Sequence, residues 1–390
     1  MPLRSRRCWR SRLSAAFLIG CVLFAASATK AEAEYTFTLI ADSTGVFSDF
    51  FFPPSLNPTG TAAFFAALDN GSSGVFKGSG GNTTTIGINT GPLSTTFPTI
   101  NQAGMVAFSE FDWNGGSPRI VAGNGGPLVT IANTAGPLSG FAGGYSTAIN
   151  GAGTAAFFAT QDSGPSGIFS GNGGAVTPIL INSASLGAGN FSMNDAGTLA
   201  FRSGNSRIVT FNAGLVTTIA DNSGALNFFG STPSISNAGT VAFAAGVGGI
   251  DGDVFGIYKG NGGALTTIAD LSGPFNYLGD FNYYLPSINA FGMVAFSAGL
   301  DAGGGGVFVG DGTVTSKVIG VGDSLFGSSV TGAGVSPISL NDAGQVAFLY
   351  QLANGTRGIA IANPVPEPGS AALLFGGLLA VLGLRRRCAQ

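Results

Sequence analysis

The chain has 390 residues, of which 65 are Gly, 32 are Phe and only 9% are charged, a composition of tight turns and apolar strands that excludes a disordered chain. Between Tyr35 and Asn363, seven Lys or Arg stand against sixteen Asp or Glu. This net charge of −9 argues against nucleic acid or anionic lipid as a partner bound through charge. The sequence has no histidine, and Cys8, Cys21 and Cys388 lie outside this range, so the range holds neither a disulfide nor a thiol nucleophile.

The N-terminal segment has the three parts of an export signal. The basic stretch RSRRCWRSR precedes the apolar stretch LSAAFLIGCVLFAASA, and Ala-x-Ala sites end at Ala28 and Ala33. This order predicts a secretory signal peptide over residues 1–33. A permanent N-terminal anchor is the alternative, and it is disfavoured because the apolar run is short and two cleavage sites follow it at once.

A nine-residue pattern then recurs seven times. Its copies are LNPTGTAAF, INQAGMVAF, INGAGTAAF, MNDAGTLAF, ISNAGTVAF, INAFGMVAF and LNDAGQVAF, which end at Phe64, Phe108, Phe157, Phe201, Phe243, Phe296 and Phe348. Asn followed three residues later by Gly suits a tight turn in which Gly has a positive φ. The alternation after the turn places Ala on one face of a strand and Phe on the other. We expect two sheets to approach closely at each Ala, with Phe filling the space on the opposite side.

Each repeat unit holds four short strands, and the units are 42 to 53 residues apart. This period is typical of propeller blades, so the sequence predicts an all-β, seven-bladed β-propeller of four-stranded blades over residues 35–363. YTFTLIAD at the start has the pattern of a fourth strand, and RGIAIAN at the end has that of a third. The N- and C-terminal strands are therefore expected to complete one blade and close the ring. A β-solenoid is the alternative, although its coils are shorter and more even.

The C-terminal segment, residues 364–390, has Pro366, Glu367 and Pro368, then an apolar stretch over 370–384, then three arginines. It closely resembles the PEP-CTERM sorting signal of Gram-negative bacteria. The resemblance implies that an exosortase-type enzyme recognises Pro-Glu-Pro and processes the tail, and that the short transmembrane segment 370–384 holds the protein transiently in the inner membrane. The arginines would stay cytoplasmic, so the body would lie outside the inner membrane, anchored until the tail is processed. A plain single-span anchor is the alternative.

The repeats resemble those of a class of exported bacterial proteins named for tandem NxxGxxAF repeats. The resemblance covers residues 35–363, and Ser236 departs from the motif where the other copies have Asn. The class has no established activity, so the resemblance implies a location and a fold and no chemistry.

Loops between strands one and two and between three and four share one face of a propeller, and in this chain they are short repeated turns. The opposite face carries the variable loops, where binding residues usually lie. We predict ligand or partner contacts there, with aromatic rings that stack on sugars or bury in a protein partner. The predicted contacts are Asp112, Trp113, Tyr145, Asp251, Tyr283 and Tyr284. For any single residue, a ring that caps the core between blades is the commoner arrangement.

Several strings are typical of enzymes, but each has a structural interpretation. Ser324 lies in GDSL without the histidine that such hydrolases use as a base. Asp42 in DSTG occupies the same repeat position as Asp221 and Asp270, which favours a turn former. The Gly-rich GNGG strings lack a following helix or lysine and suit hairpin turns. IDGDVFG lacks the further acidic positions of a calcium loop, so no metal site is assigned.

We therefore expect an exported protein of the cell surface or extracellular matrix, without cofactor or catalysis, that binds exopolysaccharide or a surface protein. The alternative is a polysaccharide hydrolase or lyase on the same scaffold. Glycosidases need a pair of carboxylates, and Glu110 is the only Glu well inside the repeats, with Asp112 two residues on.

Overall fold

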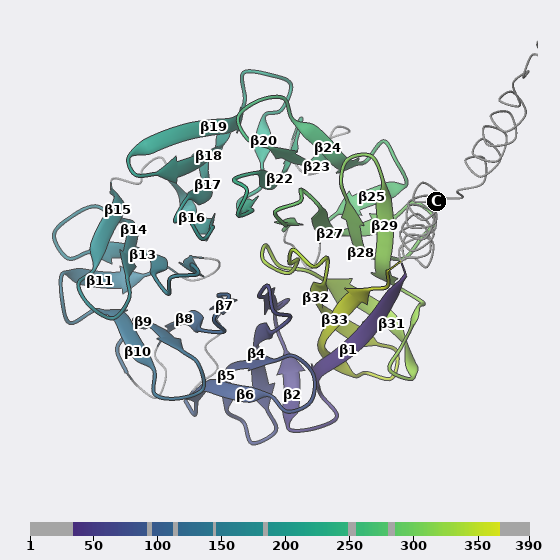
Figure 1. Ribbon diagram of the computed structural model, residues 1–390, viewed down its shortest axis with the longest axis horizontal. Helices are drawn as coiled ribbons and strands as arrows, with labels where there is room; N and C mark the ends of the chain where they lie inside the picture. The colour runs from purple at the N-terminus through teal and green to yellow at the C-terminus, as the bar shows by residue number, and fades with distance from the viewer. Residues whose placement is uncertain are drawn as a thin grey trace, which may run out of the picture. The chain divides into compact units, whose positions relative to one another are not determined.

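The computed structural model describes residues 34–91, 96–111, 116–142, 146–181, 186–248, 255–279 and 285–366. Within these ranges the strands form seven sheets arranged around a central axis, which confirms the predicted seven-bladed β-propeller (Figure 1). No helix among the described residues is long and apolar enough to cross a membrane. The predicted signal peptide, the apolar stretch 370–384, Glu367 and Pro368 lie outside the described residues.

We number the sheets blade 1 to blade 7 in chain order. Blade 1 contains β2 (Phe47–Phe50), β3 (Ser55–Leu56), β4 (Ala62–Leu68), β5 (Ser73–Gly78) and β6 (Thr84–Asn89). Blade 2 contains β7 (Thr99–Ile100), β8 (Val106–Glu110), β9 (Arg119–Gly123) and β10 (Val129–Asn133). Blade 3 contains β11 (Leu138–Phe141), β12 (Thr147–Ile149), β13 (Ala155–Gln161), β14 (Gly167–Gly171) and β15 (Thr177–Ile181). Blade 4 contains β16 (Leu186–Met193), β17 (Leu199–Ser203), β18 (Arg207–Asn212) and β19 (Leu215–Asp221).

The remaining three blades follow the same order. Blade 5 contains β20 (Phe228–Phe229), β21 (Ser234–Ile235), β22 (Val241–Gly246), β23 (Gly256–Gly260) and β24 (Thr266–Asp270). Blade 6 contains β25 (Phe275–Leu278), β26 (Ser287–Ile288), β27 (Val294–Leu300), β28 (Gly305–Gly310) and β29 (Thr315–Gly320). Blade 7 contains β30 (Ser324–Leu325), β31 (Ser328–Gly334), β32 (Val346–Leu352), β33 (Arg357–Pro364) and the N-terminal β1 (Tyr35–Asp42).

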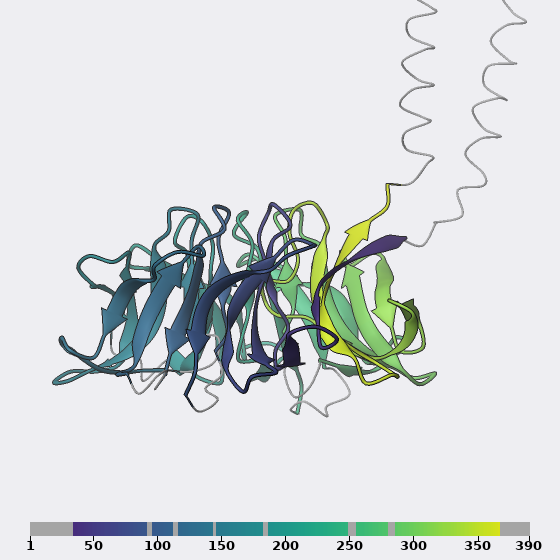
Figure 2. The same cartoon turned by 90° about the horizontal axis from the view of Figure 1, so that it is seen from below.

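The four-strand prediction needs one refinement, because the innermost strand is divided in several blades. In blade 1, β2 and β3 both pair with β4, and blades 3, 5 and 6 repeat this arrangement. All the ladders are antiparallel, and the strands run between the two faces of the ring (Figure 2). The loops of each blade therefore alternate between these faces.

The ring is closed by the two ends of the propeller, as predicted. β1 pairs antiparallel with β33 from Tyr35 opposite Pro364 to Asp42 opposite Gly358, and the two strands lie side by side in Figure 1. β33 in turn pairs with β32. One blade is thus built from both ends of the chain, so the ring has no open first or last blade.

The Asn and Gly of the repeat build the turn between the first and second strands of each blade. In blade 1 the Gly60 amide donates to the Asn57 carbonyl at 3.1 Å, and the Asn57 amide donates to the Thr61 carbonyl at 3.0 Å. The seven repeat glycines have φ between +75° and +83°, a conformation that side chains disfavour. This is the three-residue hairpin loop that ends in a left-handed residue, which explains why Gly occupies the position in every copy.

The Ala and Phe of the repeat form the contact between neighbouring blades. All seven alanines are 0% exposed, and none of the seven phenylalanines is more than 4% exposed. The core consists of seven clusters, and each contains the repeat Ala of one blade and the repeat Phe of the next. The pairs are Ala347–Phe64, Ala63–Phe108, Ala107–Phe157, Ala156–Phe201, Ala200–Phe243, Ala242–Phe296 and Ala295–Phe348. The repeat Ala of each blade therefore shares a buried core layer with the repeat Phe of the next blade.

Replacing Ala242 with Leu tests this packing. The added carbons must displace neighbours in the layer that holds Phe296, so we expect the free energy of unfolding to fall by about 1 to 3 kcal/mol. Chemical denaturation measures the change. The control Ala238→Leu adds the same atoms at an exposed turn position of the same blade, where we expect a change below about 0.5 kcal/mol. An Ala242→Leu protein as stable as the parent would mean that the layer is loosely packed.

Candidate functional site

The site that the fold builds most clearly is a pocket of about 140 Å³ on the central axis, which we call the mouth. It opens on the face of the Asn-to-Gly turns, and all seven blades contribute residues to its wall. The contributing segments are Leu56 with Pro58, 99–102, 147–149, 191–195, 234–237, 288–290, Pro337 with Ile338, and 340–342. The mouth therefore lies on the face of repeated turns, whereas the sequence favoured the opposite, variable face.

A belt of asparagine side chains surrounds the mouth and joins one blade to the next. In blade 1, Asn57 Oδ1 accepts the Thr61 amide at 2.8 Å, and its Nδ2 donates to the Asn101 carbonyl of blade 2 at 3.2 Å. Asn101 repeats this bond toward the Asn150 carbonyl at 3.0 Å. Across the closing junction, Asn341 Nδ2 donates to the Asn57 carbonyl at 3.1 Å. Asn194 and Asn289 also donate to the next blade, so five of the six repeat asparagines serve both their own turn and the neighbouring blade.

A second layer of polar groups lies two residues before the repeat Asn. Six of the seven residues at this position carry a hydroxyl, and the seventh is Ala148. The six are Ser55, Thr99, Ser192, Ser234, Ser287 and Ser339. Three of the hydroxyls accept an amide from the next blade, namely Ser192 from Ile235 at 3.0 Å, Ser234 from Ile288 at 3.2 Å and Ser287 from Leu340 at 3.0 Å. The innermost strands have no strand partner toward the axis, so these hydroxyls satisfy backbone groups that burial would otherwise leave unpaired.

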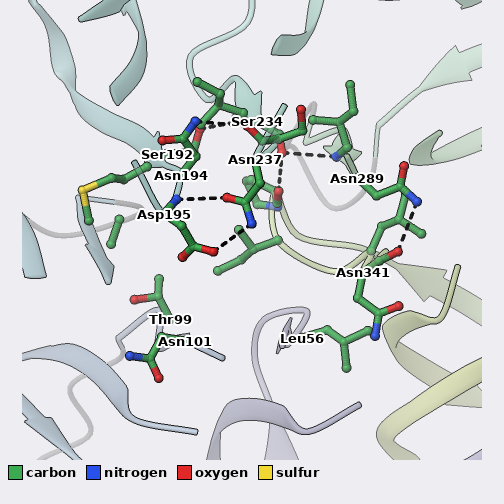
Figure 3. Close-up of a pocket in the computed structure, with 18 of the residues that line it drawn as sticks. Leu56, Thr99, Asn101, Ser192, Asn194, Asp195, Ser234, Asn237, Asn289 and Asn341 are labelled. Atoms are coloured by element: carbon green, nitrogen blue, oxygen red, sulfur yellow. Dashed lines mark hydrogen bonds between the residues drawn. The ribbon is translucent and has the colours of Figure 1, made fainter. Parts of the chain in front are cut away.

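Two carboxylates lie at the rim, one residue after the repeat Asn. Asp195 accepts the Gly151 amide at 2.6 Å and the Asn237 side-chain amide at 2.8 Å, and Figure 3 shows Asp195 and Asn237 facing each other. Asp342 accepts the Ala290 amide at 2.7 Å. No Lys or Arg is among the residues that line the mouth, so its charge is negative.

Two lysines reinforce the turns from outside the mouth. Lys77 of blade 1 donates from Nζ to the Gly104 carbonyl of blade 2 at 2.7 Å and also contacts Asn124 Oδ1. Lys259 of blade 5 makes the matching bond to the Gly292 carbonyl of blade 6 at 2.7 Å. Partial burial lowers the pKa of Lys77. These cations are held by turn carbonyls and therefore act as links between blades.

The residues predicted as ligand contacts all lie outside the described residues, so their placement stays a prediction. They are Asp112, Trp113, Tyr145, Asp251, Tyr283 and Tyr284. Of the aromatic residues near these positions in the sequence, some are buried and some are exposed. Phe50 is 2% exposed, and the Phe52 and Phe97 ring centroids are 3.9 Å apart. Of the pair Phe275 and Tyr277, Phe275 is buried and Tyr277 is 41% exposed.

The acidic residues within enzyme-like strings have structural partners. Asp42 Oδ1 accepts the Thr44 amide at 2.9 Å and its hydroxyl at 2.6 Å, and Asp221 and Asp270 make the same bonds to the serine two residues on. The Ser223 hydroxyl lowers the pKa of Asp221. These bonds confirm the interpretation as turn formers.

Glu110 and the GDSL string have structural partners as well. Glu110 is 5% exposed and forms an ion pair with Arg119 on the neighbouring strand. In GDSL, Asp323 accepts Lys317 Nζ at 2.8 Å, and Ser324 begins the short hairpin of β30 and β31. Among the described residues there is no group of three acidic or cysteine side chains that could hold a metal ion.

Two family models match parts of the chain. A family of unknown function, DUF7453, matches residues 325–372, and the PEP-CTERM protein-sorting motif matches residues 364–387. The second match confirms the sorting signal expected from the tail and implies an exported protein processed by an exosortase-type enzyme. The comparison with curated proteins finds no match.

Solved structures of other propellers resemble the chain in fold. YCF48 bound to D1 peptide is 11% identical with a TM-score of 0.43, and the alignment covers 85% of this chain and 97% of that one. An ulvan lyase of polysaccharide lyase family PL25 is 11% identical with a TM-score of 0.47, covering 84% and 95%. The WD40 domain of Toxoplasma gondii coronin is 12% identical with a TM-score of 0.46, covering 86% and 87%. At these identities the neighbours say nothing of this chain's activity.

Blade 5 offers a test of the asparagine belt, because Ser236 replaces Asn there. Its hydroxyl accepts the Thr240 amide at 3.2 Å but is too short to reach the Asn289 carbonyl of blade 6 as an Asn would. We expect Ser236→Asn to supply the missing bond and to raise the free energy of unfolding by about 0.5 to 1.5 kcal/mol. Thermal and chemical denaturation measure this change in the free energy of unfolding. The control Ser236→Ala removes the turn bond and should lower stability, and a loss of stability in Ser236→Asn would contradict the expected bond to blade 6.

Proposed function

We propose that the protein is a non-catalytic binding or structural component of the cell surface or extracellular matrix. The PEP-CTERM motif at residues 364–387 supports export and sorting. Anchoring in the inner membrane of a Gram-negative cell until the tail is processed is part of the proposal, as is membership of the class with tandem NxxGxxAF repeats. The body thus works beyond the inner membrane, among surface polymers and other exported proteins.

The mouth is the binding site in this proposal, and its lining is the observation that carries it. Hydroxyl, carboxamide and carboxylate groups from blades 2 to 7 converge there, with Gln102 and Asp342 at the rim. Such groups recognise ligands that are themselves rich in hydroxyls or amides, such as the end of an exopolysaccharide chain or a polar loop of a surface protein. The two carboxylates, together with the net charge of −9 over Tyr35–Asn363, disfavour an anionic polymer.

The chemistry of the described residues supports binding over catalysis. A hydrolase needs a nucleophile with a base, or a pair of carboxylates of which one stays protonated. Ser192, Ser234 and Ser287 accept backbone amides of the neighbouring blade, and Glu110 is engaged by Arg119. These serine and glutamate oxygens are thus engaged in structural bonds, and the rim carboxylates Asp195 and Asp342 accept the backbone amides of Gly151 and Ala290.

A substitution at the rim tests the mouth as the binding site. We expect Gln102→Trp to cover the opening and to weaken a ligand found by glycan array or pull-down with residues 35–363 by at least about tenfold, or about 1.4 kcal/mol. Gln161→Trp places the same side chain at the end of β13, on the opposite face, and should bind as the parent does. Weakening by Gln161→Trp and not by Gln102→Trp would move the site to the variable face.

Incubation with polysaccharides tests the absence of catalysis. We expect neither new reducing ends nor unsaturated sugar products, and we expect Glu110→Gln to change only stability, because it breaks the ion pair with Arg119. Product release by the parent that disappears in Glu110→Gln would establish the polysaccharide hydrolase or lyase instead.

A further inference from the structure

The two ends of the propeller meet immediately before the sorting motif. β1 and β33 are paired along their length, and the ladder ends with Tyr35 opposite Pro364. The backbone pairing continues one step further, since the Val365 amide donates to the Glu34 carbonyl at 2.8 Å. Pro366, the first residue of Pro-Glu-Pro, follows directly. Sheet structure therefore extends to the residue before the motif.

Asn363 fixes this end of β33 from two sides. Its Nδ2 donates to the Thr38 hydroxyl at 3.1 Å and to the Thr36 carbonyl at 3.3 Å, both on β1. Its Oδ1 accepts the Gln345 side-chain amide at 2.7 Å, beside the repeat turn of blade 7. A single side chain thus ties β33 to the N-terminal strand and to the face that carries the mouth.

The rest of β33 is held by the core. Ile359 and Ile361 are at most 2% exposed and belong to the cluster shared with blade 1, whereas Ala360 and Ala362 belong to the cluster on the other side of the sheet. Removing β33 from the blade would therefore open two core layers as well as two ladders. Local opening of this strand is expected to be rare.

We propose that β1 is a clasp on the segment that leads into the sorting motif, and that the closed clasp restricts processing to peptide bonds after Pro366. Cleavage by water breaks the amide bond, leaving a carboxylate on the upstream residue and an amine on the released tail. A processing enzyme needs several unpaired residues of extended chain around that bond, and proteolysis concentrates where backbone is free. Residues 357–365 are paired, so the mature protein keeps all of β33.

The clasp also links the two ends of the protein. β1, which pairs with the segment before the motif, is the first strand after the predicted signal peptide. β1 can form this pairing only after β33 has also been exported. The proposal rests on the sorting motif and on the ladder, and it is independent of ligand binding at the mouth.

Mass spectrometry of the protein recovered from a host with an exosortase system tests the cleavage boundary. We expect a mature chain whose last residue is Pro366 or a later one. A mature chain that ends at Val365 or earlier would overturn the proposal. Ligand binding at the mouth is measured in a separate assay. A protein that binds no ligand there would therefore leave the conclusion about the cleavage boundary unchanged.

Limited digestion of the full chain with proteinase K tests the clasp without the natural enzyme. We expect the digested parent to retain its residues through Val365. The rate at which residues 357–365 are trimmed should be at least fivefold higher in Asn363→Ala than in the parent. The control Asn354→Ala removes a turn bond to the Thr356 amide at the other end of β33 and should be trimmed as the parent is. Equal trimming of the parent and Asn363→Ala would overturn the clasp. Gln345→Ala, which removes the bond to Asn363 and the bond that Gln345 Oε1 accepts from Asn341 Nδ2, replaces Asn363→Ala if that variant does not fold.

Discussion

The structure depends on one packing contact, the repeat Phe of each blade against the repeat Ala of the preceding blade. Twisted sheets placed around an axis approach most closely near that axis, where two large side chains cannot face each other. A small residue on one sheet and a ring on the next fill this space, and seven such layers complete the circle. Every blade supplies both residues, so the face of one blade that carries Ala fits the face of the next blade that carries Phe. Fixed Ala and Phe positions are therefore what allow a repeated sequence to form a ring.

The mouth is likewise built from repeated positions. The repeat Asn, the hydroxyl two residues before it and the residue after it all lie on the innermost strand and its turn, so their polar atoms converge on the axis. Many of these atoms are already used, because Asn57 and Asn341 bond to the next blade and Ser234 accepts an amide from Ile288. The site is thus assembled from groups that the ring needs for stability. Donors and acceptors that the ring already holds in place lose little freedom when a ligand binds, which favours recognition.

The fold could be predicted from the sequence because its determinants are local and repeated. The turn from Asn57 to Gly60 and the alternation that ends at Phe64 lie within nine residues, and the phase of the end strands gave the closure. The partner of each Ala could not be read in this way, since Ala63 meets Phe108 of a different unit. The mouth is not predicted from the sequence, because variation is the mark of binding used there and the mouth is built from repeated positions. Aligning the residues two before each Asn would have revealed the row of hydroxyls.

Closure changes the energetics of the ring. In an open repeat array each unit contacts only its neighbours, so the end units fray first. Here the layer between Ala347 and Phe64 joins the last blade to the first, and it exists only while β1 completes blade 7. Detaching either end of the chain therefore loses a ladder and exposes a core layer, so the ends belong to the cooperative unit and are not its weakest part. A sorting tail joined to such an end can be exchanged or removed while the body stays folded, because the strand that carries it is held from both sides.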